Sequence, residues 1–396
     1  MNILYIWDSD YPWDIRVEKI CKSLQKAGHE VHIVARNLKK LNEYELIEGI
    51  HVHRLKKWAN NKINYMVSFP AFFSPFWKNL IWRIITRYGI ELIIVRDLPM
   101  AIAGIWAGEK YNIPIVFDMA EDYCSMLQEI WKIGKFKGLN LLVRNPYFAR
   151  LVENYAIRKF QHIFVVIEEA KYLLEKKGIR SEAITIISNT PILFDFKRKS
   201  NNMPTNIEFI RKRYSVIYTG GITKDRGLSI VVDAMPRIIK EIKDFLFVVI
   251  GKGYESENIL KSIDEKGLKD YTLWLGWVEH KNIYEYIASS KIGLIPHHVN
   301  DHINTTIPNK IFDYMMCGIP VLSSDAIPMR RILEEEKCGK VFRNGNANDL
   351  ANALILMYKN QENHGINGLK AIKHKYNWEI DERKLIDVIN TFQNKR

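Results

Sequence analysis

Lys310 and Asp313 lie three residues apart in an otherwise apolar stretch, residues 306–325, which reads TIPNKIFDYMMCGIPVLSSD. Pro308 suits the first turn of a helix, and side chains three residues apart in a helix point the same way. A lysine near the start of such a helix can bind a phosphate group, and an aspartate can accept hydrogen bonds from both hydroxyls of a ribose. A surface ion pair, worth about 0.2–0.5 kcal/mol, is the alternative. The stretch therefore predicts either a nucleotide site or a simple salt bridge.

A second candidate for phosphate binding follows a short apolar run upstream. Gly220 and Gly221 permit a tight turn, and Lys224 and Arg226 precede a helix that we expect to begin near Gly227. Free backbone N–H groups at a helix N-terminus suit a diphosphate, particularly beside two cations. Solvated charges next to a glycine turn are the alternative interpretation.

Two further loops bear on cofactors. Gly251 and Gly253 follow an apolar run, but the third glycine of a dinucleotide fingerprint, due near Ser256, is absent, so NAD binding is only weakly supported. A loop downstream holds three histidines and an aspartate, and two of these histidines have i,i+4 spacing (His297, His298, Asp301 and His302). Solvated loop histidines are the commonest alternative for such a group, and we predict no metal and no cofactor.

Alternating strands and helices must position these loops. Buried parallel strands are expected at Ile3–Trp7, Val31–Ala35, Leu92–Val95, Ile115–Asp118, Ile163–Ile167 and Ile184–Ser188, then at Val216–Tyr218, Leu246–Ile250, Thr272–Leu275, Ile292–Ile295 and Val321–Ser323. The spacing of apolar residues predicts a helix over 14–27, with Asp14 as its N-cap and Gly28 at its end. The polar segment 195–213 separates the two series. The sequence thus predicts two doubly wound α/β domains, with ligands beyond the carboxyl ends of strands in a cleft between them.

Bulk properties narrow the classes of protein. The 396 residues exceed one ordinary core, and a formal charge of +13 with a pI near 9.3 favours an anionic partner. Four dispersed cysteines without CxxC spacing indicate reduced thiols in a cytoplasmic protein. No uncharged apolar run reaches the length of a membrane span, and the first residues do not have the pattern of a signal peptide.

Taken together, these stretches resemble the C-terminal domain of family 4 retaining glycosyltransferases, which have the GT-B fold. The likeness is carried by GGITKDRGL, IGKGYE, LGWV and PNKIFDYMMCGIPVLSSD, and in the first half by the opening βαβ unit, VRDLP and PIVFDMAEDY. The resemblance implies an acceptor-binding domain over 1–195, a donor-binding domain over 196–375, and a helix over 376–396 that packs back on the first domain.

The resemblance also implies a role for each residue at a matching position. It assigns the donor diphosphate to Gly220, Gly221, Arg226, Thr306, Ile307 and Lys310, the nucleoside to Gly251, Trp277, Val278 and Asp313, the donor sugar to His297 and Thr305, and the acceptor side, including catalysis, to Asp118 and Glu121.

The chain departs from the family pattern at four of its positions. Thr305 and Asp313 stand where the family has two glutamates, Gly221 stands where it has a phosphate-binding arginine, and Ala120 stands where it often has a histidine. We expect Asp313 to keep the ribose role and Lys310 to supply the missing positive charge. The expectation is therefore firmer for the nucleotide than for the sugar.

The activity implied by the resemblance is metal-free, retaining transfer of a sugar from a nucleotide-diphosphate sugar, with UDP as the expected nucleotide. The expected acceptor is a saccharide or a lipid-linked saccharide of bacterial surface polysaccharide synthesis. Aromatic and cationic residues mix in 58–88 and 131–159, which predicts peripheral contact with the anionic inner face of the cell membrane. The alternatives are a nucleotide-sugar epimerase of the same fold, a catalytically silent relative, and a basic nucleic-acid-binding protein, for which no motif was found.

Overall fold

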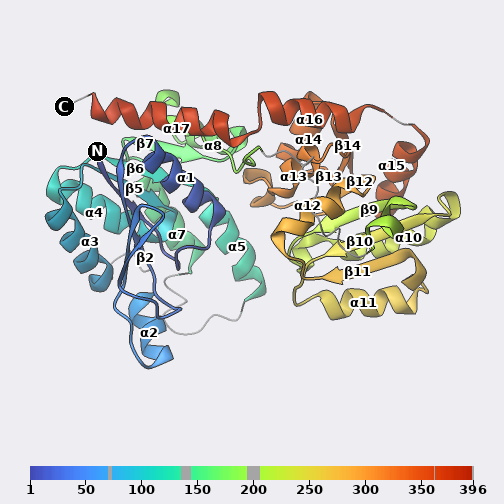
Figure 1. The fold of residues 1–396 in the computed structure, drawn as a ribbon, viewed down its shortest axis with the longest axis horizontal. Coiled ribbons are helices and arrows are strands. Elements are labelled where there is room, and N and C mark those ends of the chain that lie inside the picture. The colour runs from blue at the N-terminus through green and yellow to red at the C-terminus, as the bar shows by residue number, and fades with distance from the viewer. Residues whose placement is uncertain (70–73, 135–143, 194–205, 361, 395–396) are drawn as a thin grey trace. The chain divides into compact units, whose positions relative to one another are not determined.

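The computed structural model describes residues 1–69, 74–134, 144–193, 206–360 and 362–394. Two compact units emerge, one formed by Met1–Asn189 with Asp381–Arg396, the other by Thr190–Ile380 (Figure 1). The division expected after residue 195 falls among residues outside those described. Each unit is an α/β layer structure, which confirms the predicted fold class.

The first unit is built on an eight-stranded sheet in the order β3-β4-β2-β1-β5-β6-β7-β8. Its strands are β1 (Asn2–Ile6), β2 (Glu30–Ala35), β3 (Tyr44–Ile47), β4 (Ile50–Arg54), β5 (Leu92–Arg96), β6 (Ile115–Asp118), β7 (His162–Val165) and β8 (Ile184–Ile186). All neighbours pair in parallel except β3, which pairs antiparallel with β4. The hairpin β3–β4 was not predicted, because β3 has only four residues and two of them are exposed.

Helices cover both faces of this sheet. They are α1 (Ile15–Lys26), α2 (Asn61–Ser68), α3 (Pro75–Tyr88), α4 (Ala101–Tyr111), α5 (Tyr123–Ile133), α7 (Pro146–Ala156), α8 (Glu168–Lys176) and α17 (Trp378–Gln393), which belongs to this unit from Asp381 onward. Consecutive strand residues such as Ile93 and Ile94 point to opposite faces of the sheet, and both of these residues are fully buried. In Figure 1, α2 stands away from the sheet.

The expected first helix is confirmed, and its sequence explains its limits. The Asp14 side chain accepts a hydrogen bond from the Val17 N–H at 3.0 Å, which caps the N-terminus. Val17, Ile20 and Leu24 are fully buried on one face. The helix ends at Lys26, and Gly28 follows in a left-handed conformation with a φ of 86°.

The second unit has a six-stranded, wholly parallel sheet in the order β11-β10-β9-β12-β13-β14. Its strands are β9 (Tyr214–Thr219), β10 (Phe245–Ile250), β11 (Thr272–Gly276), β12 (Ile292–Ile295), β13 (Val321–Ser324) and β14 (Gly339–Phe342). Its helices are α9 (Ile207–Arg211), α10 (Leu228–Glu241), α11 (Ser256–Glu265), α12 (His280–Ala288), α13 (Lys310–Met316), α14 (Ile327–Glu335), α15 (Ala347–Lys359) and α16 (His364–His374). Strand β14 was not predicted, because its GKVF sequence lacks a continuous apolar run.

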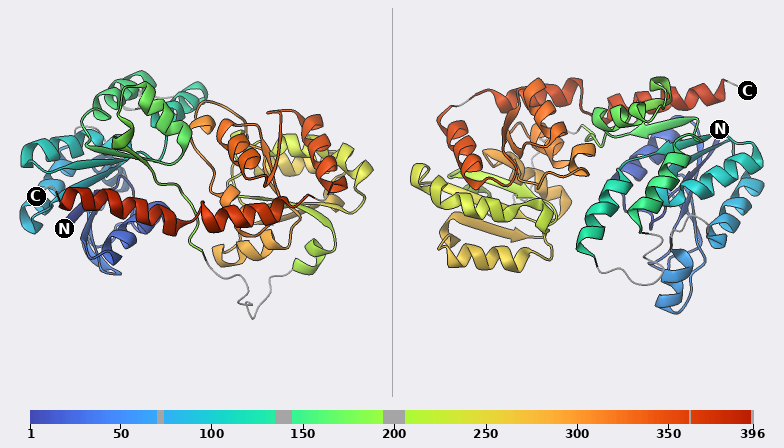
Figure 2. Two further views of the ribbon diagram at one scale, coloured as in Figure 1. Left: turned by 90° about the horizontal axis from the view of Figure 1, so that it is seen from above. Right: turned by 180° about the vertical axis from the view of Figure 1, so that it is seen from behind.

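Strand order locates the candidate sites. In the first unit, β2 to β4 lie on one side of β1 and β5 to β8 lie on the other. In the second unit, β10 and β11 lie on one side of β9, and β12 to β14 lie on the other. Two further views show helices against the sheet in each unit (Figure 2). Open α/β sheets bind ligands beyond the carboxyl ends of strands at such a switch point. The loops after β1, β5, β9 and β12 are therefore where function is expected.

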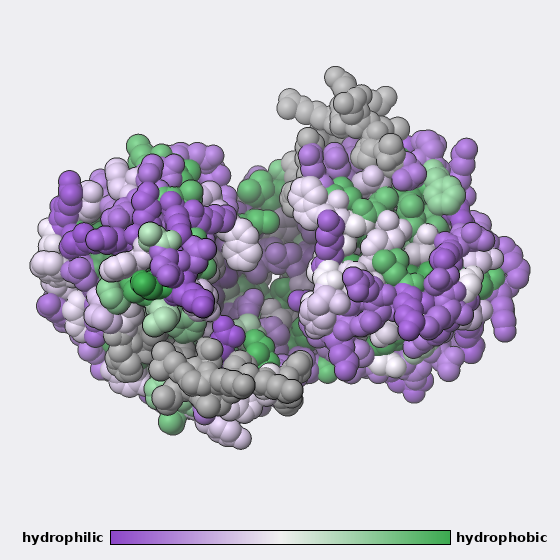
Figure 3. Space-filling view, turned by 90° about the horizontal axis from the view of Figure 1, so that it is seen from below, coloured by the Kyte–Doolittle hydropathy of each residue, from purple (hydrophilic) through white to green (hydrophobic). Residues whose placement is uncertain are grey.

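The surface of the molecule is predominantly polar in one space-filling view, with apolar residues scattered between charged ones (Figure 3). Among the described residues, no helix is both long enough and apolar enough to span a membrane.

Candidate functional site

Loops at the carboxyl edge of the second sheet are joined by backbone contacts. Gly220 N donates to Ile250 O at 2.9 Å, and Gly251 N donates to Gly276 O at 2.7 Å. Gly251 has a φ of 148°, and a Cβ there would lie 1.8 Å from Gly220 O. Only glycine allows this approach. The loops after β9, β10 and β11 therefore form one close-packed backbone platform.

The loop after β9 also meets the loop after β12. Gly227, which follows the short 3₁₀ turn Lys224–Arg226, has a φ of 66°, and a Cβ there would lie 1.9 Å from Pro296 O. This packing brings Arg226 beside His297, although 70 residues of chain separate them. The switch point β9/β12 thus gathers cationic side chains from separate segments.

Arg226, His297 and Lys310 form a cluster, called here the cation cluster. Arg226 Nη1 lies 3.2 Å from His297 Nδ1, and Lys310 Nζ lies 3.4 Å from His297 Nε2. Lys310 Nζ also lies 3.9 Å from the centroid of the Tyr218 ring, a cation–π contact. The His297 side chain is fully buried. Three elements, β9, β12 and α13, therefore converge on one basic centre.

Charge in this cluster is only partly compensated. Asp225 pairs with Arg226 at 3.4 Å, but none of the described carboxylates lies within ion-pair distance of Lys310. Burial lowers the pKa of Lys310 well below its usual range, the neighbouring Arg226 lowers it further, and Asp313 and Asp225 offset these effects in part. A bound anion at this site would meet two basic side chains, Arg226 and Lys310, with Asp225 as the close carboxylate.

Asp313 shares the half-buried side of α13 with Lys310, whereas Ile311, Phe312 and Tyr314 are buried. The Tyr284 hydroxyl donates a hydrogen bond to Asp313 Oδ1 at 3.3 Å. Lys310 has His297 and the Tyr218 ring as its partners in the described structure. Contact of Asp313 with a ribose stays a prediction.

The remaining nucleoside positions follow β11. Trp277, directly after Gly276, is 67% exposed, and Val278 is half-buried. An exposed indole beside the glycine platform could stack on a nucleobase, which is the role that the resemblance implied.

The positions expected at the donor sugar have other partners. The Thr305 hydroxyl donates to the carbonyls of Asp301 at 3.2 Å and His302 at 3.0 Å, and the residue is 7% exposed. His297 lies between Arg226 and Lys310. Direct contact of either residue with a sugar stays a prediction, and these contacts weigh against it. Thr306 is half-buried and Ile307 is buried.

Asp118, expected on the acceptor side, lies in the interior of the first unit. Arg16 donates to its Oδ1 at 2.6 Å, the Tyr5 hydroxyl donates to its Oδ2 at 2.6 Å, and Arg96 Nη1 approaches Oδ2 at 3.4 Å. These contacts hold the pKa of Asp118 below its usual value despite burial. The side chain is fully buried. The geometry therefore gives Asp118 a structural role and weighs against direct contact with an acceptor, which stays a prediction, whereas Glu121 is exposed.

Two carboxyl groups that the sequence reasoning missed lie at the β1/β5 switch point. Asp97 has a φ of 57°, rare for a non-glycine residue, and accepts a hydrogen bond from Ala120 N at 3.2 Å. Burial raises the pKa of Asp97 to about 6, and burial together with the charge of Asp97 raises the pKa of Asp8 to about 7. Their sequence signal was their position directly after predicted strands.

Two other partners were also missed. Arg16 was detectable as an arginine within the apolar face of α1, where it is 4% exposed. Tyr218, under Lys310, ends a strand and had no distinguishing signal, because aromatic residues are common in buried strands.

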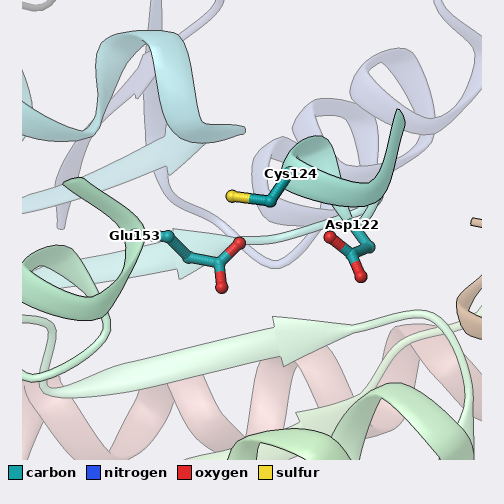
Figure 4. A group of neighbouring side chains, drawn as sticks. All are labelled: Asp122, Cys124 and Glu153. Carbon is teal, nitrogen blue, oxygen red and sulfur yellow. The ribbon is translucent and has the colours of Figure 1, made fainter. Parts of the chain in front are cut away.

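One group in the described part of the chain has the geometry of a metal-ligand set. Potential ligand atoms of Asp122, Cys124 and Glu153 lie within 4.8 Å of one another (Figure 4). Asp122 caps α5 through Ser125, and Glu153 pairs with Lys177. Burial and the charge of Glu153 raise the pKa of the Cys124 thiol. The histidines of the 297–302 loop do not form such a group among the described residues.

Comparison with known proteins gives two family matches. The family model described as Glycosyl transferases group 1 matches residues 213–360, and the model described as Glycosyl transferase 4-like domain matches residues 14–190. The chain is 24% identical over 181 residues to the phosphatidyl-myo-inositol mannosyltransferase of Mycobacterium leprae. This match covers 45% of this chain and 46% of that protein. The chain thus spans about half the length of the curated relatives it matches first.

Two solved structures are similar over nearly the whole chain. Sucrose-phosphate synthase from Thermosynechococcus elongatus gives a TM-score of 0.78 at 16% identity, covering 100% of both chains. The HepE protein of Anabaena, solved in complex with UDP, gives a TM-score of 0.70 at 14% identity, covering 99% of this chain and 100% of that chain. At such identities the likeness concerns the fold.

Proposed function

The chain belongs to the glycosyl transferases of group 1 and has their GT-B architecture, and from this premise we propose that it transfers a sugar from a UDP-sugar to a saccharide or lipid-linked saccharide with retention of anomeric configuration. The observation that carries the proposal is the cation cluster at the β9/β12 switch point. The nucleotide proposed is UDP, because the similar HepE structure contains UDP.

Charge development explains what the cluster would do. As the sugar departs with oxocarbenium character, negative charge builds on the diphosphate. Arg226 and Lys310 are fixed where they can stabilise that charge. Fixed donors of this kind need no rearrangement during the reaction. In this proposal Asp313 binds the ribose and Trp277 stacks on the base.

For the acceptor, the proposal assigns contact to exposed Glu121 rather than to buried Asp118. Helices α2, α3 and α7 of the same unit carry exposed apolar side chains, namely Ile63, Tyr65, Met66, Phe76, Trp82, Tyr147, Phe148, Leu151 and Tyr155. Exposed cations such as Arg83 and Arg150 lie among them in the sequence. Aromatic and cationic residues together suit an anionic lipid surface. These helices are proposed to contact the membrane that holds a lipid-linked acceptor in surface polysaccharide synthesis.

Part of the expected membrane segment has a different role. Trp77, counted among its aromatic residues, is fully buried in the core of the first unit. Residues 70–73 and 135–143 lie outside the described part of the chain.

The proposed function is tested by thermal shift with UDP, GDP, TDP and their sugars, followed by NMR of the product anomer. One nucleotide is expected to stabilise the protein by RT ln(1 + [L]/Kd). Lys310→Met should weaken binding of that nucleotide by roughly 10–100-fold, the effect of about 1.4–2.8 kcal/mol. Lys243→Met, an exposed lysine before β10 at the other end of the sheet, is the matched control. Absence of any nucleotide shift would overturn the proposal, and release of an epimerised nucleotide sugar would favour the epimerase.

A further inference from the structure

His297 is in an unusual hydrogen-bonding position, since both of its ring nitrogens face side chains that normally donate. Nδ1 lies 3.2 Å from Arg226 Nη1, and Nε2 lies 3.4 Å from Lys310 Nζ. The ring is fully buried, so water does not supply an alternative partner.

A neutral imidazole has one N–H and one acceptor nitrogen. Arginine remains protonated in proteins and can only donate, so Nδ1 must accept from Arg226 and the ring proton must lie on Nε2. Nε2–H then faces Lys310 Nζ. A charged ammonium has no lone pair with which to accept this proton, whereas a neutral amine has one. Both ring nitrogens of His297 have a suitable partner when Lys310 is the amine.

Burial and the neighbouring Arg226 favour the same state, whereas Asp313 and Asp225 oppose it in part. Arg226 and Asp225 come from the turn after β9, Tyr218 from the end of β9, Asp313 and Tyr314 from α13, and His298 from the loop that carries His297. Asp225 pairs with Arg226, and Asp313 accepts from Tyr284. Burial and the proximity of Lys310 and Arg226 lower the pKa of His297, and burial and Arg226 lower the pKa of Lys310.

We propose that His297 is a positioning residue that holds Lys310 as a neutral amine in the ligand-free protein, and that binding of a nucleoside diphosphate sugar is coupled to uptake of one proton by Lys310. The proposal rests on the proposed function, because it takes the diphosphate as the ligand. The proton comes from solvent, and no covalent bond other than N–H forms. The two negative charges of the diphosphate replace the imidazole as the partner of Lys310 and stabilise its ammonium form.

The coupling makes affinity depend on pH with a definite sign. Protonation is favoured in the complex and disfavoured in the free protein, so the association constant falls as pH rises through the interval between the two pKa values of Lys310. A lysine that was already charged before binding would give no such dependence.

Isothermal titration calorimetry with UDP-glucose tests the proposal, because its diphosphate has no group that titrates near pH 7. UDP-galactose, UDP-N-acetylglucosamine and GDP-mannose are titrated in parallel, and the sugar nucleotide that binds is used throughout. Titrations in buffers of different ionisation enthalpy at one pH count the protons taken up. Uptake of close to one proton is expected for the unaltered protein.

Three variants separate the proposed role from a merely structural one. His297→Gln lets Lys310 be charged in the free protein, so proton uptake should fall towards zero while measurable binding remains. Lys310→Arg carries a permanent charge and should also bind without uptake. His298→Gln alters the neighbouring half-buried histidine, and should keep the uptake.

The possible outcomes are distinguishable. Binding without proton uptake by the unaltered protein would overturn the role of His297 and leave the proposed function standing. Unchanged uptake in His297→Gln would show that another group takes the proton and would also overturn it. No binding of any sugar nucleotide would overturn the proposed function and this inference with it.

Discussion

Individual buried charges define both candidate sites. In the second unit a lysine, an arginine and a histidine gather at 3.2–3.4 Å with little compensating negative charge. In the first unit Asp118 is surrounded by Arg16, Arg96 and Tyr5. The first arrangement has one close carboxylate, Asp225, whereas the Asp118 carboxylate accepts hydrogen bonds from three side chains. This contrast supports the proposed diphosphate site in the second unit and a structural role for Asp118 in the first.

Asp313→Ala tests the ribose role at the residue scale. Loss of a hydrogen bond to a charged group costs about 1.5–3 kcal/mol, so nucleotide Kd should rise roughly 10–100-fold. The ligand-free melting temperature should change little, because Asp313 is only half-buried and the hydrogen bond it accepts from Tyr284 is long, at 3.3 Å. Calorimetry and thermal melting measure the two effects. Tyr284→Phe is the control, and equal losses of affinity in both variants would contradict the assignment.

Asp118→Asn tests the structural network. Removing one charge from a buried ion pair costs about 3–5 kcal/mol, because Arg16 and Arg96 would keep their charges without the main partner. Urea denaturation should show this loss of unfolding free energy. Asp387→Asn, an exposed aspartate on α17, should stay within about 0.5 kcal/mol. A stable Asp118→Asn protein with lost transfer activity would instead indicate a direct catalytic role.

Elements place these residues through their ends and faces. Strand ends deliver Thr219 and Ile295 to the same edge, and glycines at 220, 227 and 251 let the following loops touch backbone to backbone. On a face of the first sheet, β2 and β4 bring three histidines together. His32 and His51 stack with centroids 4.7 Å apart, and His32 Nδ1 lies 3.1 Å from His53 Nε2.

This histidine face predicts acid sensitivity. Burial, then the charges of His32, His51, Arg87 and Arg83, lowers the pKa of His53 from 6.5 to about 3. The folded protein therefore binds fewer protons than the unfolded chain across this interval, so unfolding free energy falls as pH decreases from 6.5, by at most about 1.4 kcal/mol per pH unit for this group.

Thermal melting between pH 7 and 5 checks this expectation. His53→Asn should reduce the dependence of melting temperature on pH, because asparagine does not titrate. His374→Asn, which alters an exposed histidine at the end of α16, should leave the dependence unchanged. An identical pH dependence in His53→Asn and the unaltered protein would contradict the assignment.

At the scale of the whole molecule, two α/β units carry different surfaces and different sites. The net charge of +13 is larger than the charge of the cation cluster, so basic residues elsewhere in the chain contribute to it. Exposed aromatic residues of α2, α3 and α7 occur in the first unit, whereas the cation cluster belongs to the second. Substitutions in the first unit can therefore test membrane contact, and substitutions in the second unit can test nucleotide binding.

Co-sedimentation with vesicles tests membrane contact. Binding to vesicles that contain phosphatidylglycerol should be strong at low salt and weak at high salt, because screening removes the attraction of exposed cations. A Trp82→Ala, Tyr147→Ala double variant should lose at least several-fold in binding. Tyr172→Ala, at an exposed tyrosine on α8, is the control. No sedimentation of the unaltered protein at low salt would contradict the membrane proposal.

The amino-acid sequence by itself determined the alternation of strands and helices, because apolar periodicity reflects local burial on a sheet. It also determined that Lys310 and Asp313 lie on one face of a helix, because side chains three residues apart in a helix point the same way. It left β3, β4 and β14 undetected: β3 and β14 are four-residue edge strands, and β4, although it alternates, carries two histidines and an arginine in five residues.

Only the tertiary structure decided what each charged residue contacts. Arg226, His297 and Lys310 are distant in the chain and meet because parallel strands end at one edge of a sheet. Asp118 ends strand β6, where a residue that contacts a ligand is often found. Its carboxylate instead accepts hydrogen bonds from Arg16, which lies on a helix about 100 residues earlier in the chain. Local patterns specify elements, whereas long-range packing fixes the partner, burial and charge state on which chemistry depends.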